Sequence, residues 1–449
     1  MNRGFRNFGL GATAATATYF IDSEYFGSGI RRSLLTASTV IRVAILYKFE
    51  WSTGDFEAVH SKAARLVFDS CVANSGLYIK FGQQIASIAS VLPPEWQRFK
   101  QLYDDAPPVP FKDIARQIKR EFGKDVHDLF DNFEESPRAS ASIAQVHRAT
   151  LKGTSIPVAV KVQKPEVIKQ VETDLLAFSL VLHTVERVFD LKLTWMLPTI
   201  LSHLRQELDF VNEAKNSEKC INSFNEIPEF KDKVHVPTVY WDLTTPRVMT
   251  TEWIDGTAFT HTEEISKRWG QDKVTTMVST LVDLFNDQIF RTGFVHCDPH
   301  PGNLLIRPTP NNPKFPQIVV LDHGLYTQCS ESFLTEYRDL WVNLFSHDIE
   351  KVEAVVNKWG IRDVQLIAMD VLQAPPERDP ITGKLSQEQK LDVQRKMKER
   401  LQQYLTNSDS IPRELIFIGR NLNIIRSNNK LYGSPVNRIN LMGAYAIKM

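Results

Sequence analysis

The chain has 449 residues, 43% of them hydrophobic and 24% charged, which is typical of a folded globular protein of two lobes or domains. Lys plus Arg and Asp plus Glu both number 53, and no basic run is interleaved with aromatic residues, so the sequence gives no indication of nucleic-acid binding. The four cysteines lack Cys-x-x-Cys spacing, which argues against a disulfide framework or a structural zinc site.

Two segments near the amino terminus bear on membrane binding. Residues 7–21 are uncharged, rich in small residues and only mildly apolar, and they are fewer than the about 20 apolar residues that span a bilayer. We interpret them either as a disordered or surface-lying leader or as a membrane anchor. Residues 30–49 place four basic residues (Arg31, Arg32, Arg42 and Lys48) around a set of aliphatic ones, a pattern that predicts an amphipathic basic helix on a membrane surface or on the domain itself.

A helical pattern of apolar residues follows from about Glu57 to Val91. Within it, Lys80, Gln83 and Gln84 fall at i, i+3 and i+4, on one side of the helix. A polar trio of this kind is usually a solvated face, and the pattern alone favours that interpretation. If the trio points inward, its amine and amides need buried partners, which would make it a site.

A break at Asp104 to Pro108 predicts a boundary before a catalytic domain that begins with a helix over Phe111 to Phe122. A turn of small residues then leads into a strand, and Thr154 to Val162 forms the second strand of the pair. Small residues let backbone amides approach phosphates, although alanine and serine leave a stiffer backbone than the usual glycine. The residues expected to approach a nucleotide are Ala139, Ser140, Ala141 and Ser142.

The second strand ends in Val158-Ala159-Val160-Lys161, which matches the kinase strand whose lysine contacts the α- and β-phosphates of ATP. Helical patterns follow over 163–188 and 198–215. The latter carries three acids, Glu207, Asp209 and Glu213, which cannot all share one helix face, so at least one is free to pair with Lys161.

The stretch from Thr250 to Gly256, which includes Glu252, resembles a strand that runs into a hinge where backbone groups can bind adenine. A helix over Val274 to Arg291 then leads to the segment His296 to Asn303. Later the chain is mainly helical, with a loop predicted over 373–389 and a polar stop over 426–430 after the last predicted helix.

Three polar residues in and after that segment form the clearest pattern in the sequence. Asp298 and Asn303 are five residues apart, as in the kinase catalytic loop, where the Asp orients the proton of the nucleophile and the Asn helps to hold magnesium. Asp322 follows a β-branched run and precedes His323-Gly324, the position of the second metal ligand. Each alone is more often a turn residue or a cap, but their order and spacing predict a Mg·ATP site.

With these motifs in order, the sequence resembles the UbiB family, the aarF-domain-containing (ADCK) atypical kinases, over roughly Phe56 to Asn428. The family motifs K-x-G-Q, A-A-A-S-x-x-Q-V-H, E-x-D, H-x-D-x-H-P-G-N and D-[FH]-G correspond to Lys80 to Gln83, Ala139 to His147, Glu207 to Asp209, His296 to Asn303, and Asp322 to Gly324. Ser140 departs from the usual alanine, and His323 replaces the usual kinase phenylalanine, so switching of that side chain is not assumed.

The resemblance implies an α+β, bilobal protein-kinase-like fold with a largely helical C-lobe and an N-terminal helical extension over the site where a protein substrate would enter. Lys80 and Gln83 then point inward, with Lys80 toward Glu207 and Asp209. Glu213 is the expected partner of Lys161, with Glu207 as the alternative. The absence of an Ala-Pro-Glu anchor after Asp322 agrees with a site closed to proteins. The predicted segments are a membrane-anchor or amphipathic leader (1–55), the helical extension (56–110), an N-lobe (111–256) and a C-lobe (257–449).

The resemblance also implies a function in coenzyme Q and phospholipid homeostasis at the mitochondrial inner membrane, with single-pass or peripheral attachment. The expected cofactors are ATP and Mg²⁺, and the expected partners are a lipid or quinone-like molecule and the membrane. Nucleic acid is not an expected partner, and the oligomeric state stays open. The activity is expected to be ATP hydrolysis or phosphorylation of a small molecule or lipid.

Two alternatives differ from this interpretation. An aminoglycoside- or choline-type phosphotransferase also has an H-x-D-x-x-x-x-N loop and a later Asp. The motifs Lys80-x-x-Gln83 and Val158-Ala159-Val160-Lys161 count against this alternative. A nucleotide- or lipid-binding scaffold without turnover is the second alternative, and the intact set Lys161, Asp298, Asn303 and Asp322 favours an active site over it.

Overall fold

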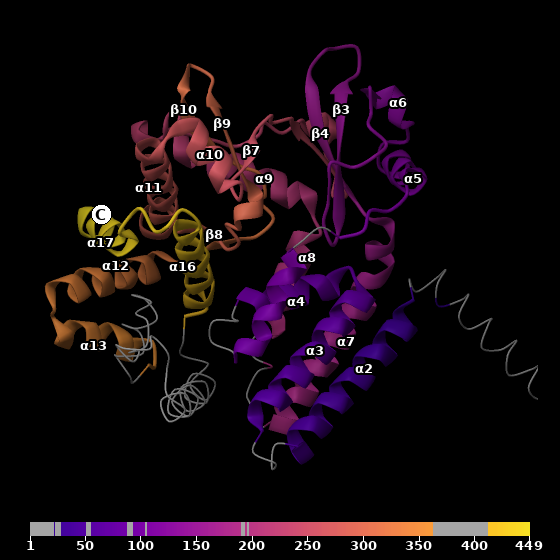
Figure 1. The fold of residues 1–449 in the computed structure, drawn as a ribbon, viewed down its shortest axis with the longest axis horizontal. Helices are drawn as coiled ribbons and strands as arrows, with labels where there is room; N and C mark the ends of the chain where they lie inside the picture. Colours follow the sequence, from indigo (N-terminus) through magenta and orange to yellow (C-terminus); the bar gives the residue numbers. More distant parts are fainter. Residues whose placement is uncertain are drawn as a thin grey trace, which may run out of the picture. The chain divides into compact units, whose positions relative to one another are not determined.

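The computed structural model describes residues 22, 28–50, 55–87, 93–103, 106–189, 194, 197–361 and 412–449. These residues divide into two compact units (Figure 1). The first comprises the described residues up to Leu208 together with Arg247–Thr250, and the second comprises Asp209–Pro246 together with the described residues from Thr251. The predicted leader at 7–21 and the predicted elements between 362 and 411 lie outside the described residues. The predicted division into a leader (1–55), a helical extension (56–110), an N-lobe (111–256) and a C-lobe (257–449) stays a prediction.

The amino-terminal part of the first unit is a group of helices (Figure 1). Helix α2 packs against α3 and α7, and α4 packs against the 3-10 helix η3. Their shared core contains the buried aromatic side chains Tyr78, Phe81 and Phe99. The elements of this group are α2 (Gly29–Ile45), the π-helical turn η1 (Leu46–Glu50), α3 (Phe56–Asn74), α4 (Leu77–Ser87), η3 (Pro94–Tyr103), α7 (Pro165–Phe189) and α8 (Leu197–Glu207).

The basic segment predicted at 30–49 forms α2 and η1, and its buried side packs on the protein. Arg32 is almost fully buried, and its guanidinium donates through Nε and Nη2 to both carboxylate oxygens of Asp174 on α7, at 3.1 and 2.5 Å. Its third nitrogen donates to the carbonyl of Asn74 at the end of α3. One arginine therefore joins three helices. No helix in the described part of the chain is long and apolar enough to span a membrane.

The single helix predicted from Glu57 to about Val91 is instead two helices, α3 and α4. The break falls at Ser75 and Gly76, which both have left-handed backbone conformations with φ of 55° and 52°. A left-handed residue ends the α-helical hydrogen-bonding pattern, and glycine adopts that conformation without steric cost. The break redirects the chain, so that α4 starts afresh before Lys80.

A five-stranded sheet completes the first unit, which includes the last strand, β6, only up to Thr250. Strand β3 pairs antiparallel with β1, β2 and β4, and β6 follows β4 in the sheet order. On β4, Val158, Val160 and Val162 are fully buried and alternate with the half-buried Lys161, as the two-residue period of a strand requires. The remaining elements are α5 (Phe111–Phe122), which confirms the predicted helix, α6 (Val126–Leu129), β1 (Phe130–Asp131), β2 (Ala139–Ser140), β3 (Ala144–Leu151), β4 (Pro157–Gln163) and β6 (Val248–Glu252).

The single helix predicted over 198–215 is wrong, because the chain forms α8 up to Glu207 and then a new helix, α9 (Phe210–Asn225). Asp209 causes the restart, because its side chain accepts a hydrogen bond from the Val211 N–H and caps α9 at its N-terminus. The three acids of this stretch therefore lie on two helices and a cap. Glu207 belongs to the first unit, and Asp209 and Glu213 belong to the second.

The second unit contains a mixed four-stranded sheet and a two-stranded sheet among helices. Strand β10 pairs antiparallel with β9 and parallel with β5, and β8 pairs antiparallel with β11. Aromatic side chains from several helices, among them Phe285, Phe290, Tyr337 and Trp341, are fully buried in one core. The strands are β5 (Val234–His235), β7 (Thr257–Ala258), β8 (Phe294–His296), β9 (Leu304–Thr309), β10 (Asn312–Val320) and β11 (Tyr326–Gln328).

The helices of this unit are α9, α10 (Thr262–Trp269), α11 (Gln271–Asp287), the π-helical turn η7 (Gln288–Thr292), α12 (Glu331–Ser346), α13 (Ile349–Lys358), α16 (Glu414–Leu431) and α17 (Arg438–Lys448), with short 3-10 turns η5 (Pro228–Phe230), η6 (Trp241–Leu243) and η8 (Pro301–Asn303). The polar stop predicted at 426–430 is wrong, because α16 continues to Leu431. Asparagine is a poor helix former, but Asn428 and Asn429 are buried and donate hydrogen bonds to the backbone of Pro299 and Val436, which supports the helix there.

Candidate active site

The antiparallel pair β9 and β10 places Asn303 and Asp322 at one end of a hairpin. Leu304 pairs with Val320, and the Leu321 N–H donates to the Asn303 carbonyl at 2.9 Å. Asn303 therefore directly precedes β9, while Asp322 comes two residues after β10 at the same end. Both side chains are half-buried. The two predicted metal ligands thus come from adjacent backbone segments, as a shared ion would require.

His296, at the end of β8, joins the segments that carry Asp298 and Asp322. Its Nδ1 accepts a hydrogen bond from the Asp298 N–H at 3.1 Å, and its Nε2 donates to the Asp322 carbonyl at 2.9 Å. Burial lowers the pKa of His296, against the opposing effect of the carboxylates of Asp322 and Asp298. A neutral ring with the proton on Nε2 satisfies both contacts. His296 therefore fixes the catalytic loop relative to the Asp322 segment.

Asp298 has two carboxylate oxygens in different surroundings. Oδ2 lies 2.9 Å from Nη2 of Arg420 on α16, in an ion pair whose side chains are 17% and 8% exposed. Oδ1 is buried and has no hydrogen-bond partner among the described residues. A buried acceptor without a partner is costly, and in native proteins it often marks a position for a ligand or for catalysis. The arginine holds one side of the carboxylate and leaves the other oxygen available to accept a hydrogen bond from a ligand.

Helix α16 also holds the backbone of the catalytic loop. The Asn421 side chain donates to the His296 carbonyl at 2.6 Å, and the Asn428 side chain donates to the Pro299 carbonyl at 3.0 Å. The two asparagines are seven residues apart, which is two helical turns, so they lie on one face of α16. Both are fully buried. Together with Arg420, they make this helix a rigid support for the segment that carries Asp298.

The turn after β10 brings a second carboxylate toward Asp322. The Gly324 N–H donates to Asp322 Oδ1 at 2.8 Å, and a Cβ added at Gly324 would lie 3.2 Å from that oxygen and 3.9 Å from Oε2 of Glu213. The Asn216 side chain, one turn after Glu213 on α9, donates to the His323 carbonyl at 3.0 Å. Glu213 therefore lies beside the Asp322-His323-Gly324 turn, and a side chain at Gly324 would crowd these carboxylates.

The donor set fits Mg²⁺. Asp322 supplies a carboxylate and Asn303 a carboxamide oxygen, which are hard ligands, and magnesium commonly takes one or two such protein ligands and completes its shell with water and phosphate oxygens. The described residues contain no group of three or more His, Cys, Asp or Glu side chains able to hold a metal ion. The predicted magnesium site has only one such side chain, Asp322, beside the amide of Asn303, so it is not a group of this kind.

His323 is buried within the unit and does not project from it. Its Nε2 donates to the Val320 carbonyl at 3.1 Å, its Nδ1 accepts from the Tyr326 hydroxyl at 2.9 Å, and its exposed fraction is 0%. The Tyr326 ring in turn stacks on His296 with 4.8 Å between ring centroids. The residue that stands in place of the usual kinase phenylalanine is thus part of the packed support beneath the loop.

Glu252, predicted near the nucleotide, is held within the second unit. Its carboxylate accepts a hydrogen bond from His235 at 2.7 Å and pairs with Arg307 at 3.2 Å, and its N–H donates to the Thr238 carbonyl. Burial alone would raise the pKa of Glu252, but the contacts with His235 and Arg307 outweigh it and lower this pKa to about 2. The role of Glu252 in nucleotide binding stays a prediction.

The other predicted nucleotide-binding residues lie in the first unit. Ala139 and Ser140 form β2, and the chain turns back through Ala141, whose N–H donates to the Ala144 carbonyl. The hydroxyls of Ser140 and Ser142 are buried without a hydrogen-bond partner among the described residues. Buried hydroxyls of this kind in a turn of small residues suit a polar ligand. Lys161 lies opposite Val146 in the pairing of β3 and β4.

Gln145 and His147 of the same motif attach the sheet to the preceding linker. Gln145 accepts from the Val109 N–H at 2.9 Å and donates to the Val109 carbonyl at 3.2 Å, and it also contacts His147, whose Nδ1 donates to the Glu134 carbonyl. The buried Lys164 donates to the Pro107 carbonyl at 2.8 Å. Gln145 of the motif and Lys164 after β4 therefore fix the linker at Pro107 and Val109 to the sheet.

The predicted inward orientation of Lys80 has a clear basis in the first unit. Its Nζ lies 3.0 Å from Oε2 of Glu207, with the two side chains 18% and 8% exposed. Gln83, one turn later on α4, donates to the Leu102 carbonyl of η3 at 2.8 Å. The structure thus brings Lys80 and Glu207 together, whereas Asp209 caps α9 and its contact with Lys80 stays a prediction. The solvated-face interpretation does not describe Lys80 or Gln83.

Sequence reasoning missed the residues of α16. Arg420, Asn421 and Asn428 were placed in a final helix and a polar stop, without a link to Asp298. The available signal was the seven-residue spacing of Asn421 and Asn428, two of the four asparagines in this helix, because a buried carboxamide on a helix face needs a partner. Nothing in the sequence identified that partner, since Asn421 and His296 are 125 residues apart.

Comparisons with known proteins show the family of the chain. Residues 101–356, more than half of the chain, match the family model described as the ABC1 atypical kinase-like domain. The chain is 35% identical to ABC1 family protein lscO of Purpureocillium lilacinum, over 96% of this chain and 79% of that protein. It is also 35% identical to AarF domain-containing protein kinase 1 of Xenopus laevis, over 80% of this chain and 67% of that protein.

Among solved structures, the complex of Rv3197 with erythromycin from Mycobacterium tuberculosis aligns with a TM-score of 0.48 and 22% identity, covering 79% of this chain and 94% of that one. Because this TM-score is below 0.5, the fold class is assigned from the family match and not from the superposition. That match, together with the mixed helices and sheets of both units, confirms the predicted α+β kinase-like fold. The chain belongs to the ABC1 family of AarF-domain-containing atypical kinases.

Proposed function

We propose that this protein binds Mg·ATP and transfers the γ-phosphoryl group to water or to the hydroxyl of a lipid or other small molecule. The observation that carries the proposal is the state of Asp298. One of its carboxylate oxygens is held by Arg420, while the other is buried without a partner among the described residues. A structural Asp would have both oxygens satisfied, whereas an Asp that receives a proton needs one oxygen available.

Asn303 and Asp322 would hold the magnesium ion, which when bound neutralises negative charge on the phosphates. Asp298 orients the attacking hydroxyl through Oδ1 and accepts its proton as the new oxygen–phosphorus bond forms. The bond between the γ-phosphorus and the bridging oxygen breaks, and ADP leaves with that oxygen. His296 stays neutral throughout and holds Asp298 and Asp322 in register through its two backbone contacts.

In the proposed nucleotide site, Lys161 contacts the α- and β-phosphates, beneath the turn that carries Ser140 and Ser142. Glu213 is the proposed partner of Lys161. Two observations support Glu213 over Glu207: Glu207 is already paired with Lys80, and Glu213 is buried beside the Asp322-His323-Gly324 turn. Glu252, at the end of β6, is proposed to lie at the hinge near adenine.

The helical extension is proposed to restrict the acceptor to lipids and small molecules. Support comes from Lys80 and Gln83, which are committed to contacts with Glu207 and Leu102 and so hold α4 in place. Asp209 is proposed to help hold this extension. A relative from Dictyostelium discoideum, 34% identical over 87% of this chain, is named a probable serine/threonine-protein kinase. Phosphate transfer to a generic protein acceptor therefore has to be measured beside transfer to lipids.

We extend the proposal to coenzyme Q and phospholipid homeostasis at the mitochondrial inner membrane, with a lipid or quinone-like molecule as partner. The support is the family resemblance and the exposed aliphatic side chains of α2, such as Leu34 and Ile41. Fractionation of mitochondria followed by carbonate extraction tests the attachment. Release of the protein by carbonate would indicate a peripheral protein and contradict a spanning anchor.

The central experiment measures Mg-dependent ATP binding and phosphate release by the purified protein, with and without quinone-like lipids, liposomes and a generic protein acceptor. We expect the Asp322→Asn variant to lose Mg·ATP affinity, whereas the exposed control Asp339→Asn on α12 should behave like the wild type. If Asp322→Asn binds Mg·ATP as tightly as the wild type, the metal site is wrong. Binding without any turnover would instead favour a nucleotide- and lipid-binding scaffold.

A further inference from the structure

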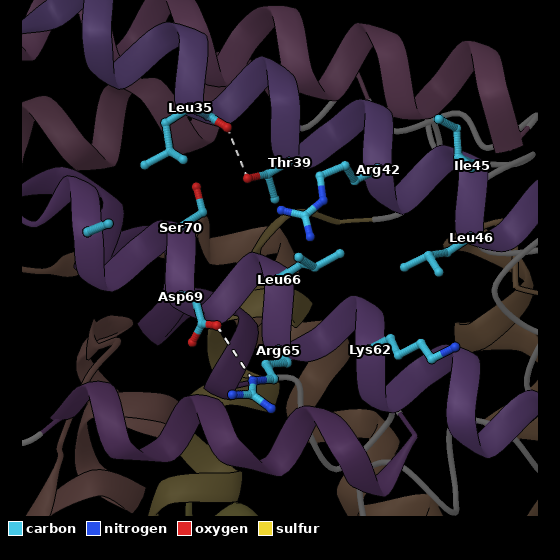
Figure 2. A pocket seen from close by; sticks show the side chains of 11 residues that line it. Leu35, Thr39, Arg42, Ile45, Leu46, Lys62, Arg65, Leu66, Asp69 and Ser70 are labelled. Carbon is cyan, nitrogen blue, oxygen red and sulfur yellow. Dashed lines mark hydrogen bonds and ion pairs between the residues drawn. The ribbon is translucent and has the colours of Figure 1, made fainter.

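A pocket of about 670 Å³ lies in the first unit between α2 and α3 (Figure 2). Its volume falls within the roughly 300–1,000 Å³ of small-molecule sites. Apolar side chains from both helices line it, and three basic side chains stand among them. The apolar residues are Leu35, Ile45, Leu46, Leu66 and Ala73, and the basic residues are Arg42, Lys62 and Arg65. None of these residues belongs to the candidate active site.

Helix α2 is amphipathic in the opposite sense to an ordinary surface helix. Its buried face carries the polar residues Arg32, Thr36 and Thr39. Its outward face carries Leu34 and Ile41, which are 66% and 59% exposed, and the half-exposed Ile30 and Ile45. The spacing of these four aliphatic residues, 4, 7 and 4, places them on one side of the helix. A surface helix normally shows the reverse pattern, and a continuous apolar exposed face marks an interaction site.

Ile45 connects this exposed apolar face with the pocket, because it both lines the pocket and is 51% exposed. The mouth of the pocket is therefore continuous with the aliphatic face of α2. An apolar ligand presented by a surrounding apolar layer can enter such a site without crossing water. A lipid bilayer provides a layer of this kind.

The charges at the pocket favour an anionic group. Arg42 extends from α2 into the space between the two helices (Figure 2), and it forms no ion pair within the described part of the chain. Lys62 pairs with Glu50 at 2.7 Å, and Arg65 lies 3.7 Å from Asp69. The one acid among the lining residues is thus engaged by Arg65, and the guanidinium of Arg42 is left for a ligand. Arginine suits phosphate because its planar fork of donors matches two oxygens.

We propose that this pocket takes one acyl chain of an anionic phospholipid from a membrane surface, with the lipid phosphate bound by Arg42 and the aliphatic face of α2 lying in the apolar layer. The apolar lining accepts the chain, and Lys62 and Arg65 add positive charge around the headgroup. The inference rests on the proposed membrane association for the source of the lipid. Its test uses no nucleotide, so its failure is distinct from a failure of the proposed phosphoryl transfer.

The experiment measures cosedimentation of the full chain with vesicles of phosphatidylcholine containing 20% phosphatidylglycerol, and with vesicles of phosphatidylcholine alone. We expect binding to the anionic vesicles, with Arg42→Gln weakening it by more than about fivefold, because any one basic residue near an anionic surface contributes about that factor and Arg42 adds a direct contact with the lipid phosphate. The matched control is Arg31→Gln, which removes an exposed arginine of the same helix that does not line the pocket. This control should weaken binding clearly less.

A second variant tests the apolar part of the site. Ile45→Gln should also weaken binding to anionic vesicles severalfold. Ile447→Gln, which changes an exposed isoleucine near the end of α17 that does not line the pocket, should not. All four substitutions are at exposed positions, and an unchanged thermal unfolding midpoint will show that they leave the fold intact. Equal effects of Arg42→Gln and Arg31→Gln would overturn the phosphate contact, and equal effects of the two isoleucine variants would overturn the pocket.

Two further outcomes would also overturn the proposal. Saturable binding of monomeric dodecyl phosphate without binding to vesicles would assign the pocket to a free amphiphile. Concentration-dependent dimerisation that Leu34→Gln abolishes, measured by sedimentation equilibrium, would assign the aliphatic face of α2 to a second copy of the chain.

Discussion

Two buried arginine–aspartate pairs, one in each unit, differ in how completely they are satisfied. In the first unit, Arg32 contacts both carboxylate oxygens of Asp174, and both side chains are at most 3% exposed. In the second unit, Arg420 contacts only Oδ2 of Asp298, and Oδ1 has no partner among the described residues. The first pair is closed and joins helices. The second pair is open on one side and joins helix α16 to the loop between β8 and β9.

The difference separates a structural pair from a candidate catalytic one. A buried ion pair costs desolvation, and it is tolerated when hydrogen bonds satisfy both partners. Burial raises the pKa of Asp174, and the hydrogen bonds and charge of Arg32 oppose that shift. A pair with an unsatisfied buried oxygen lowers the stability of the folded protein, so its presence indicates a role other than stabilisation. We therefore expect substitutions at the closed pair to change stability, and substitutions at the open pair to change turnover.

The largest expected effect is on the closed pair. Asp174→Ala leaves the Arg32 charge buried without its partner, which should lower the free energy of unfolding by about 3–5 kcal/mol. Urea denaturation followed by circular dichroism measures it. The control is Asp113→Ala, which removes a more exposed i,i+3 partner of Arg116 and should cost about 0.2–1 kcal/mol. An Asp174→Ala effect as small as that of the control would mean that the pair does not hold the helices together.

The next effect concerns the open pair. Arg420→Ala removes the contact that positions Asp298, and we expect phosphate release to fall about 10- to 100-fold, or about 1.4–2.7 kcal/mol, with little change in the KM for ATP. Arg420→Lys should restore part of the turnover, because lysine supplies the charge without the planar fork. Steady-state kinetics separate the two constants. A change in KM alone would show that Arg420 acts on nucleotide binding and not on Asp298.

A smaller effect is expected where α16 holds the loop backbone. Asn428→Ala removes the donor to the Pro299 carbonyl, and the lost hydrogen bond should cost about 1 kcal/mol of unfolding free energy. Turnover should fall less than in Arg420→Ala, because Asp298 keeps its arginine. Urea denaturation and phosphate release on the same preparation measure both quantities. A loss of turnover greater than that of Arg420→Ala would place the main support of Asp298 in the backbone contact.

The smallest effect is confined to acid pH. The pKa of Glu252 is lowered from 4.5 to about 2, so its pairing with His235 and Arg307 stabilises the folded state fully above pH 4.5. That stabilisation is lost as the pH falls through about 2. The difference in unfolding free energy between wild type and Glu252→Gln should therefore shrink over this window. A difference that stays constant from pH 5 to pH 2 would contradict the lowered pKa.

The sequence allowed prediction of the kinase-like class because its local patterns agree with the fold. The alternation of Val158, Val160 and Val162 marks a half-buried strand, and the spacing from Asp298 to Asn303 matches the length of one loop. Both features depend only on residues close together in the chain. Helix breaks were harder to predict, because the left-handed Ser75 and the capping Asp209 are single residues inside long helical patterns.

The support of the site could not be predicted from the sequence. Arg420 and Asn421 meet residues more than 120 positions earlier, and such contacts leave no trace in local periodicity. Lys80 is a different case, because the family resemblance predicts its inward orientation toward Glu207, whereas periodicity alone favours a solvated face. Its partner Glu207 lies on a helix much later in the chain. The amphipathic helix predicted at 30–49 is present as α2, but the sequence did not indicate which of its side chains face inward: Arg32 is buried and Leu34 is exposed.

The most direct test of the account compares Asp298→Asn with Asp174→Asn in one set of measurements of phosphate release and thermal unfolding. The account predicts that Asp298→Asn lowers turnover by at least about 100-fold, as expected for loss of a general base, with an unfolding midpoint close to that of the wild type. Asp174→Asn should lower the midpoint and leave the turnover of the folded protein unchanged. If Asp298→Asn keeps wild-type turnover, or if its main effect is on the midpoint, Asp298 is a structural residue and the proposed chemistry is wrong.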